Sequence, residues 1–217
     1  MIVAFAGRRV DAVDTAVVSA DANSAKAINV DADDAPADNA DGDNAHVSSR
    51  TASRSRFPAK REPRVREDLR VLFTRVGASV LVASAACGAD IIAHEVAGTL
   101  GMRRVLLLPT EPSMFRAESV SDRGDGWGER YDLLLREVAQ QGDVRVVRLG
   151  ASLESYRQLN EALLDVAEGV AERTNGAERV LAVAAWDGES YGDDDVTAAF
   201  INAARRREMA VEEVRTS

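Results

Sequence analysis

The loop from Ser84 to Asp90 holds the residue types best suited to binding an anion. It reads Ser-Ala-Ala-Cys-Gly-Ala-Asp and follows an apolar run. Small residues such as Cys87, Gly88 and Ala89 let the backbone approach a ligand, and the free N–H groups of a new helix attract phosphate. The loop therefore predicts a phosphate cradle, although small residues at a strand–helix junction also serve close packing. Asp90 is more typical of a helix cap than of a ligand-binding residue.

Two arginines follow the first apolar run of the chain, in the segment Gly7-Arg8-Arg9. A guanidinium group pairs with phosphate oxygens through parallel hydrogen bonds, so both arginines are candidate phosphate ligands. The alternative is a pair of solvated side chains at the end of a strand.

A further group of candidates lies after the third apolar run, which Pro109 closes. In this segment Phe115 and Trp127 can stack on a base, and Arg116 or Arg130 can pair with phosphate. Core packing competes with this role. Trp127 in particular is more typical of an anchor that holds a loop against the domain.

Apolar runs alternate with helical periodicity along most of the chain, and this alternation is typical of a parallel sheet covered on both faces. We expect one α/β domain over residues 1–217, a Rossmann-like three-layer sandwich with a mainly parallel sheet. Ligands of such sheets bind beyond the carboxyl ends of the strands, here the loops after Ala6, Ala83, Pro109 and Trp186. The expected strands are 2–6, 79–83, 105–108, 144–147, 180–185 and 210–214; the expected helices cover 65–76, 89–100, 127–139, 156–170 and 195–207, and a loop runs from 109 to about 126.

Residues 10–55 differ in composition from the rest of the chain. Ala, Asp, Asn and Ser dominate this stretch, which has too few large apolar groups to offset the entropy cost of ordering. We expect a disordered, low-complexity acidic insertion, in which His46 is a surface residue. The acidic run from Asp31 to Asp43 lacks the Glu at the twelfth position of a calcium loop, so no metal site is expected.

The bulk composition excludes several classes of protein. The net charge of −9 argues against binding to nucleic acid, which requires Lys and Arg to neutralise phosphates. The single cysteine, Cys87, permits no intrachain disulfide, and no apolar run approaches the roughly 18 residues that span a bilayer. We expect a cytoplasmic protein without a membrane partner.

A set of short motifs resembles the SLOG superfamily, which includes DNA-processing protein A and the LONELY GUY phosphoribohydrolases. The resemblance covers the chain except the acidic insertion and is closest to bacterial nucleotide-sensor members. It implies a ligand such as a nucleotide, a cyclic nucleotide or an ADP-ribose-like signal, an effector protein as partner, self-association, and no cofactor. The motifs are Ala-Phe-Ala-Gly-Arg-Arg-Val-Asp (4–11), Arg-Phe-Pro (56–58), Ala-Cys-Gly-Ala-Asp-Ile (86–91), Leu-Leu-Pro (107–109), Phe115, Glu-Ser-Val (118–120), Trp127, Arg130-Tyr131 and Trp-Asp-Gly (186–188).

The resemblance also implies which residues line the pocket. Gly7 and Arg9 form one wall, and Ser84, Gly88, Ala89 and Asp90 form the second. Arg8 replaces the histidine that is usual in the first motif, which keeps a positive charge there.

The largest departure from the superfamily lies in the segment Gly192-Asp193-Asp194-Asp195-Val196-Thr197, where members commonly carry a Gly-Gly-Thr phosphate loop. Only Thr197 matches that loop. Carboxylates at a helix start stabilise the helix but occupy the field that a phosphate would use. The ligand then has no phosphate here, or binding has been lost, or, less simply, a divalent cation bridges acid to phosphate.

Asp187 and Gly188 follow the fifth strand, where an acidic side chain can receive a ribose hydroxyl. We assign no catalytic residue. A phosphoribohydrolase-type N-glycosidase remains an alternative to the binding module, but the acid expected after Thr197 is replaced by Ala198, Ala199 and Phe200. DNA processing is the weakest alternative, and an interaction module with a degenerate pocket stays open.

Overall fold

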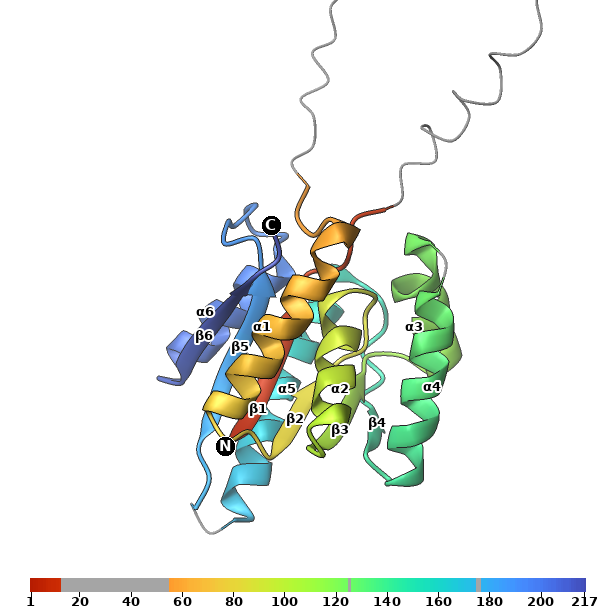
Figure 1. Cartoon of the computed structure of the whole chain (residues 1–217). Helices are drawn as coiled ribbons and strands as arrows, with labels where there is room; N and C mark the ends of the chain where they lie inside the picture. Colours follow the sequence, from red (N-terminus) through yellow and green to blue (C-terminus); the bar gives the residue numbers. More distant parts are fainter. Residues whose placement is uncertain (13–54, 125, 175–176) are drawn as a thin grey trace, which may run out of the picture. The chain divides into compact units, whose positions relative to one another are not determined.

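The computed structural model describes residues 1–12, 55–124, 126–174 and 177–217. Six strands among these residues form one sheet in which every neighbouring pair is parallel, and helices cover both faces (Figure 1). The predicted α/β sandwich with a parallel sheet is therefore confirmed.

The strand order is β4-β3-β2-β1-β5-β6. Strand β1 is central, and Ile2 pairs with both Val80 and Val180. Its apolar run is continuous because both faces of a parallel sheet are covered. The strands are β1 (Ile2–Gly7), β2 (Val80–Ala83), β3 (Arg103–Leu108), β4 (Val144–Val146), β5 (Val180–Trp186) and β6 (Ala210–Arg215).

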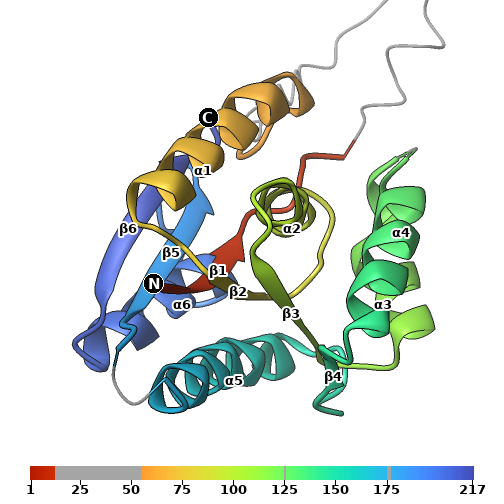
Figure 2. The same ribbon diagram turned by 60° about the horizontal axis from the view of Figure 1, so that its bottom comes forward.

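Figure 2 shows α1 (Glu62–Arg75) and α2 (Ala89–Thr99) on one face of the sheet and α5 (Leu153–Glu172) and α6 (Val196–Arg206) on the other. Alternate residues of β1 point to opposite faces, so Phe5 joins the core under α1 and α2, and Ala4 joins the core under α5 and α6. Helix α4 (Trp127–Gln140) contributes to the same core as α2.

The prediction of a loop from 109 to about 126 is wrong. The segment contains helix α3 (Pro112–Ser119) and a 3-10 turn, η2 (Ser121–Arg123). Proline at the first turn favours a helix start, and Phe115 is buried, but eight residues are too few for a clear helical period in the sequence. Helix α6 also begins one residue later than expected, because Asp195 is its N-cap.

The start of the expected insertion packs within the domain. Val10 is buried, and the backbone N–H of Asp11 donates to the carbonyl of Phe57. The rest of the expected insertion, residues 13–54 with the acidic run and His46, lies outside the described residues. Among the helices that the structure describes, none is both long and apolar enough to cross a membrane.

The chain order of the strands defines one switch point in the sheet. From β1 the chain adds β2, β3 and β4 on one side, then crosses to add β5 and β6 on the other. In such sheets the crevice between the two diverging strands is the usual ligand position. Here the carboxyl ends of β1 and β5 meet at this point, and they carry Arg8 and Asp187.

Candidate functional site

The predicted cradle packs directly against the chain that leaves β1. Arg9 and Gly88 form an isolated antiparallel bridge, in which the N–H of Val10 donates to Cys87 and the N–H of Ala89 donates to Arg8. Gly88 has a φ of +106°, and a Cβ there would lie 2.5 Å from the Val10 nitrogen. This close approach requires glycine.

The start of α2 keeps donors for an anion. The N–H of Ala89 is used by the Arg8 carbonyl, at 3.1 Å. Within the described ranges, no atom accepts a hydrogen bond from the N–H of Asp90 or Ile91. Unpaired N–H groups at a helix start carry the positive end of the helix dipole, so they favour a negative ligand.

Two arginines share one carboxylate beside this helix start. The Arg9 guanidinium pairs with Asp122 on η2, and the Arg123 Nε lies 3.4 Å from Asp122 Oδ2. The Arg9 Nε also donates to the Cys87 sulfur at 3.4 Å. Burial raises the pKa of the Cys87 thiol, so this thiol is neutral at physiological pH. The cluster Arg9, Cys87, Asp122 and Arg123 therefore carries one excess positive charge.

Three buried oxygens near the strand ends have no hydrogen-bond partner among the described residues. They are Ser84 Oγ after β2, Asp90 Oδ1 at the start of α2 and Thr110 Oγ1 after β3. Each residue is at most 7% exposed. Buried polar atoms are almost always paired in native proteins, so each of these oxygens is available to a ligand or to water.

Asp90 does not cap α2, because Gly88 occupies the N-cap position. Its carboxyl turns back to the loop, where Oδ2 accepts the N–H of Ala86 at 3.3 Å. Burial raises the pKa of Asp90 to about 7, against the opposing effect of the Ala86 and Gly7 backbone. The group is therefore partly protonated at neutral pH, and its protonated form can donate to a ligand oxygen.

His94 holds the start of the cradle in place from within α2. Its Nε2 lies 3.0 Å from the carbonyl oxygen of Ser84. Burial lowers the pKa of His94 to about 4, so the ring is neutral and Nε2–H is the donor to this carbonyl. We regard His94 as a positioning residue.

Arg8 lies on the other side of β1 and is 7% exposed. Its Nη1 and Nη2 each donate to Asp195 at 2.6 Å, and its Nη2 donates to the Glu189 carbonyl at 2.9 Å. The guanidinium also lies 5.5 Å from the ring centroid of Tyr191. The donors of the Arg8 guanidinium are therefore used in hydrogen bonds to the protein and do not point to a ligand.

Asp195 fills the start of α6 in the manner of a bound anion. Besides Arg8, its side chain accepts the N–H of Ala198 at 3.0 Å and of Tyr191 at 3.2 Å. Asp193 and Asp194 are exposed, and Thr197 is buried. Only one of the three acids therefore points inward, and it occupies the place that a second phosphate would need.

Both oxygens of the Asp187 carboxylate also accept hydrogen bonds from the protein. One of its oxygens accepts Arg8 Nε at 3.3 Å, and the other accepts the Tyr191 hydroxyl at 2.5 Å. A Cβ on Gly188 would overlap the Arg215 guanidinium. A ribose hydroxyl would have to compete with these contacts, so the assignment of Asp187 to ribose stays a prediction.

The structure does not bring the aromatic candidates to the cradle as exposed platforms. Phe115 is 1% exposed and lies 6.1 Å from Tyr131, and Trp127 is 7% exposed. Arg116 pairs with Asp132. Pro109 accepts the N–H of Leu149, so it joins β3 to the segment after β4. In this conformation these residues are packing groups, as the alternative for Trp127 anticipated.

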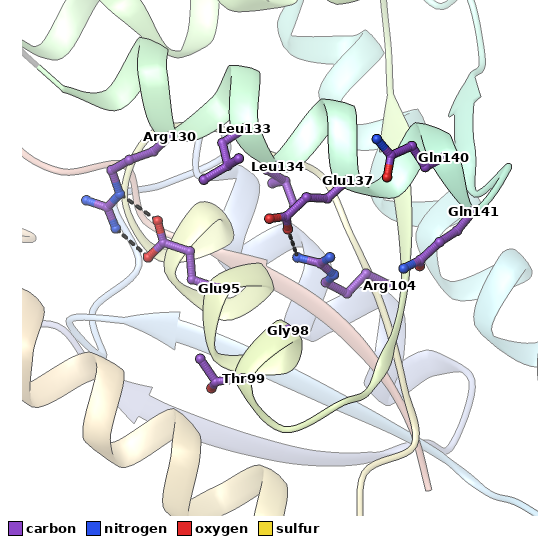
Figure 3. A pocket seen from close by; sticks show the side chains of 10 residues that line it. All are labelled: Glu95, Gly98, Thr99, Arg104, Arg130, Leu133, Leu134, Glu137, Gln140 and Gln141. Carbon is purple, nitrogen blue, oxygen red and sulfur yellow. Dashed lines mark hydrogen bonds and ion pairs between the residues drawn. The ribbon is translucent and has the colours of Figure 1, made fainter.

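Arg130 lines a separate pocket of about 570 Å³ between α2 and α4 (Figure 3). It binds Glu95 through two hydrogen bonds, of 2.7 and 2.8 Å, while Arg104 pairs with Glu137. The lining includes Gly98 and Gln140, at the carboxyl ends of α2 and α4, so the pocket extends away from the cradle. Its charges compensate one another, and we do not assign the phosphate to it.

Sequence reasoning missed the most charged part of the site. Asp122, Arg123 and Thr110 were not among the predicted residues. The run Ser-Asp-Arg-Gly after residue 120 is a turn signal with charged groups next to a predicted ligand loop, and this could have identified η2. The partner of Arg9, by contrast, lies 113 positions away in the chain.

Comparison of this chain with protein-family models, with curated proteins and with solved structures gives no match.

Proposed function

We propose that this chain is a binding module for a nucleotide derivative, and that it holds the ligand phosphate at the start of α2. The phosphate would accept the N–H groups of Asp90 and Ile91 and pair with Arg9. Ser84 Oγ would supply a further hydrogen bond from the adjoining strand end.

The observation that carries the proposal is the excess positive charge of Arg9 and Arg123 beside a helix start with free donors. A local charge of this kind matters in a chain with a net charge of −9, because the overall field repels anions. The start of α6 is the weaker position, since Asp195 occupies it.

The motif resemblance supports the same reading. We propose that the domain is a SLOG-type nucleotide sensor that works in the cytoplasm with an effector protein and self-associates. The parallel sandwich is compatible with this assignment, and the resemblance of the motifs is its only specific support.

A thermal-shift screen of the full chain tests the proposal. The probes are nucleoside mono-, di- and triphosphates, cyclic nucleotides and ADP-ribose. A ligand at 100 times its Kd adds about 2.7 kcal/mol to the free energy of unfolding, which is measurable as a higher Tm. The proposal predicts that at least one probe raises the Tm of the wild type and that Arg9→Gln reduces this shift by about half or more.

The matched control is Arg64→Gln, which removes an exposed arginine on α1 that pairs with Asp68. This variant should respond to ligand as the wild type does. No shift with any probe would refute the binding module.

A further inference from the structure

The Asp122 carboxylate occupies the position in which a ligand anion would meet Arg9. It is the only carboxylate that the described residues offer to both Arg9 and Arg123. The Asp122 side chain is 40% exposed, and those of Arg9 and Arg123 are 29% and 33% exposed. Ion pairs with this exposure are weak, so an incoming anion can exchange with Asp122 at small cost.

The Asp195 carboxylate, which pairs with Arg8, is held much more firmly than Asp122. The Asp195 side chain has no solvent exposure, and it holds Arg8 through two hydrogen bonds while it caps α6. Removing this carboxylate would leave the buried charge of Arg8 with Asp187 as its single acidic partner among the described residues. Three carboxylates pair with the consecutive arginines. The Asp187 and Asp195 side chains are 4% and 0% exposed, so only Asp122, at 40%, is exposed enough to exchange.

We propose that a terminal phosphate monoester of the ligand replaces Asp122 at Arg9 and Arg123. This inference rests on the proposed function and specifies its ligand class. When Asp122 turns to solvent, the positive charges of Arg9 and Arg123 lose the carboxylate that they share. A phosphate monoester carries a charge of about −1.5 to −2 at pH 7 and compensates both arginines, whereas a cyclic diester carries a single charge and leaves one arginine unpaired.

Calorimetric titration at fixed salt concentration tests the exchange. The probes are AMP and GMP, which are monoesters, and their 3′,5′-cyclic diesters. We expect the wild type to bind at least one monoester more tightly than its cyclic form. Asp122→Asn should tighten monoester binding about two- to fivefold, because one weakly held competing charge is removed, and should tighten diester binding less.

Two controls separate exchange from a general change of charge. Asp68→Asn removes an exposed acid that pairs with Arg64 within α1, and it should leave both affinities within about twofold of the wild type, because surface charges away from the site act weakly. In an Arg9→Gln background, Asp122→Asn should lose most of its effect, since interacting residues are not additive.

The outcomes distinguish the two proposals. If nucleotides bind the wild type through Arg9 but Asp122→Asn does not tighten monoester binding, or if diesters bind as tightly as monoesters, the exchange is refuted and the binding module stands. If only ADP-ribose binds the wild type, the exchange is refuted and the binding module stands. If no probe of this titration or of the thermal-shift screen binds, the inference and the nucleotide site on which it rests are both refuted.

Discussion

Arg8 and Asp195 are 187 positions apart in the chain and form a buried ion pair through two hydrogen bonds of 2.6 Å. The pair joins the carboxyl end of β1 to the N-cap of α6. It lies at the switch point of the sheet, where an α/β protein would usually place its ligand. The protein therefore supplies its own carboxylate, Asp195, on one side of β1, and our proposal places the ligand phosphate on the other side, at the start of α2.

The first prediction concerns the stability of this ion pair. Asp195→Asn should lower the free energy of unfolding by about 3 kcal/mol, because it removes the closer of the two carboxylates that pair with the buried Arg8 and leaves only Asp187. Asp194→Asn is the matched control, since Asp194 is exposed, and it should change stability by less than about 0.5 kcal/mol. Urea denaturation at pH 7 measures both variants, and equal stabilities would contradict the role of the pair.

The second prediction concerns Asp90. Its pKa is about 7 in the folded protein and 3.8 in the reference state, so the folded state binds more protons between these values. The free energy of unfolding should therefore fall as the pH rises from about 4 to 7, by up to about 1.4 kcal/mol per pKa unit of difference. Denaturation curves at pH 5 and pH 8 should reveal this component as the difference between wild type and Asp90→Asn. An identical pH dependence of the two proteins would refute it.

The third prediction concerns His94, whose protonation should lower the stability as the pH falls. The pKa of His94 is about 4 when folded and 6.5 in the reference state, so the unfolded state takes up protons first as the pH falls. This group should lower the stability as the pH falls from about 6.5 to 4, and His94→Gln should remove that component. Proton NMR of the ring measures the pKa directly, and a titration midpoint near 6.5 would disprove the assignment.

The fourth prediction tests the close approach of the cradle to β1. Gly88→Ala places a Cβ 2.5 Å from the Val10 nitrogen in a left-handed conformation, and it should cost about 2–4 kcal/mol. Gly169→Ala is the matched control, because this glycine lies within α5 with open space around it and should gain up to about 1 kcal/mol. Thermal unfolding of both variants checks the expectation, which fails if Gly88→Ala is as stable as the wild type.

The sequence predicted the sheet well for a physical reason. Strands such as β1 and β5 are buried on both faces, so each appears as an unbroken apolar run closed by a polar residue or glycine. The cradle was recognisable because small residues follow directly on such a run. Helix α3 was not predicted, because eight residues, only some of them buried, do not reveal a helical period.

The pairings of charged side chains were not predictable in the same way. Arg8 and Arg9 are adjacent in the chain, yet one meets Asp195 and the other meets Asp122 on opposite sides of β1. Which acid each arginine meets depends on the strand order and on where α6 and η2 begin. The sequence pattern around 193–195 indicated an acidic helix start, but only the fold identifies Asp195 as the inward-facing acid.

The most direct test of the account is the affinity of wild type and Arg9→Gln for the nucleotide that gives the largest thermal shift, measured by calorimetry at one salt concentration. Loss of a charged hydrogen bond to phosphate costs about 1.5–3 kcal/mol, so we predict that the Kd rises about ten- to a hundredfold in Arg9→Gln. Arg64→Gln should bind with the Kd of the wild type. An unchanged Kd in Arg9→Gln would contradict the assignment of the phosphate to the start of α2.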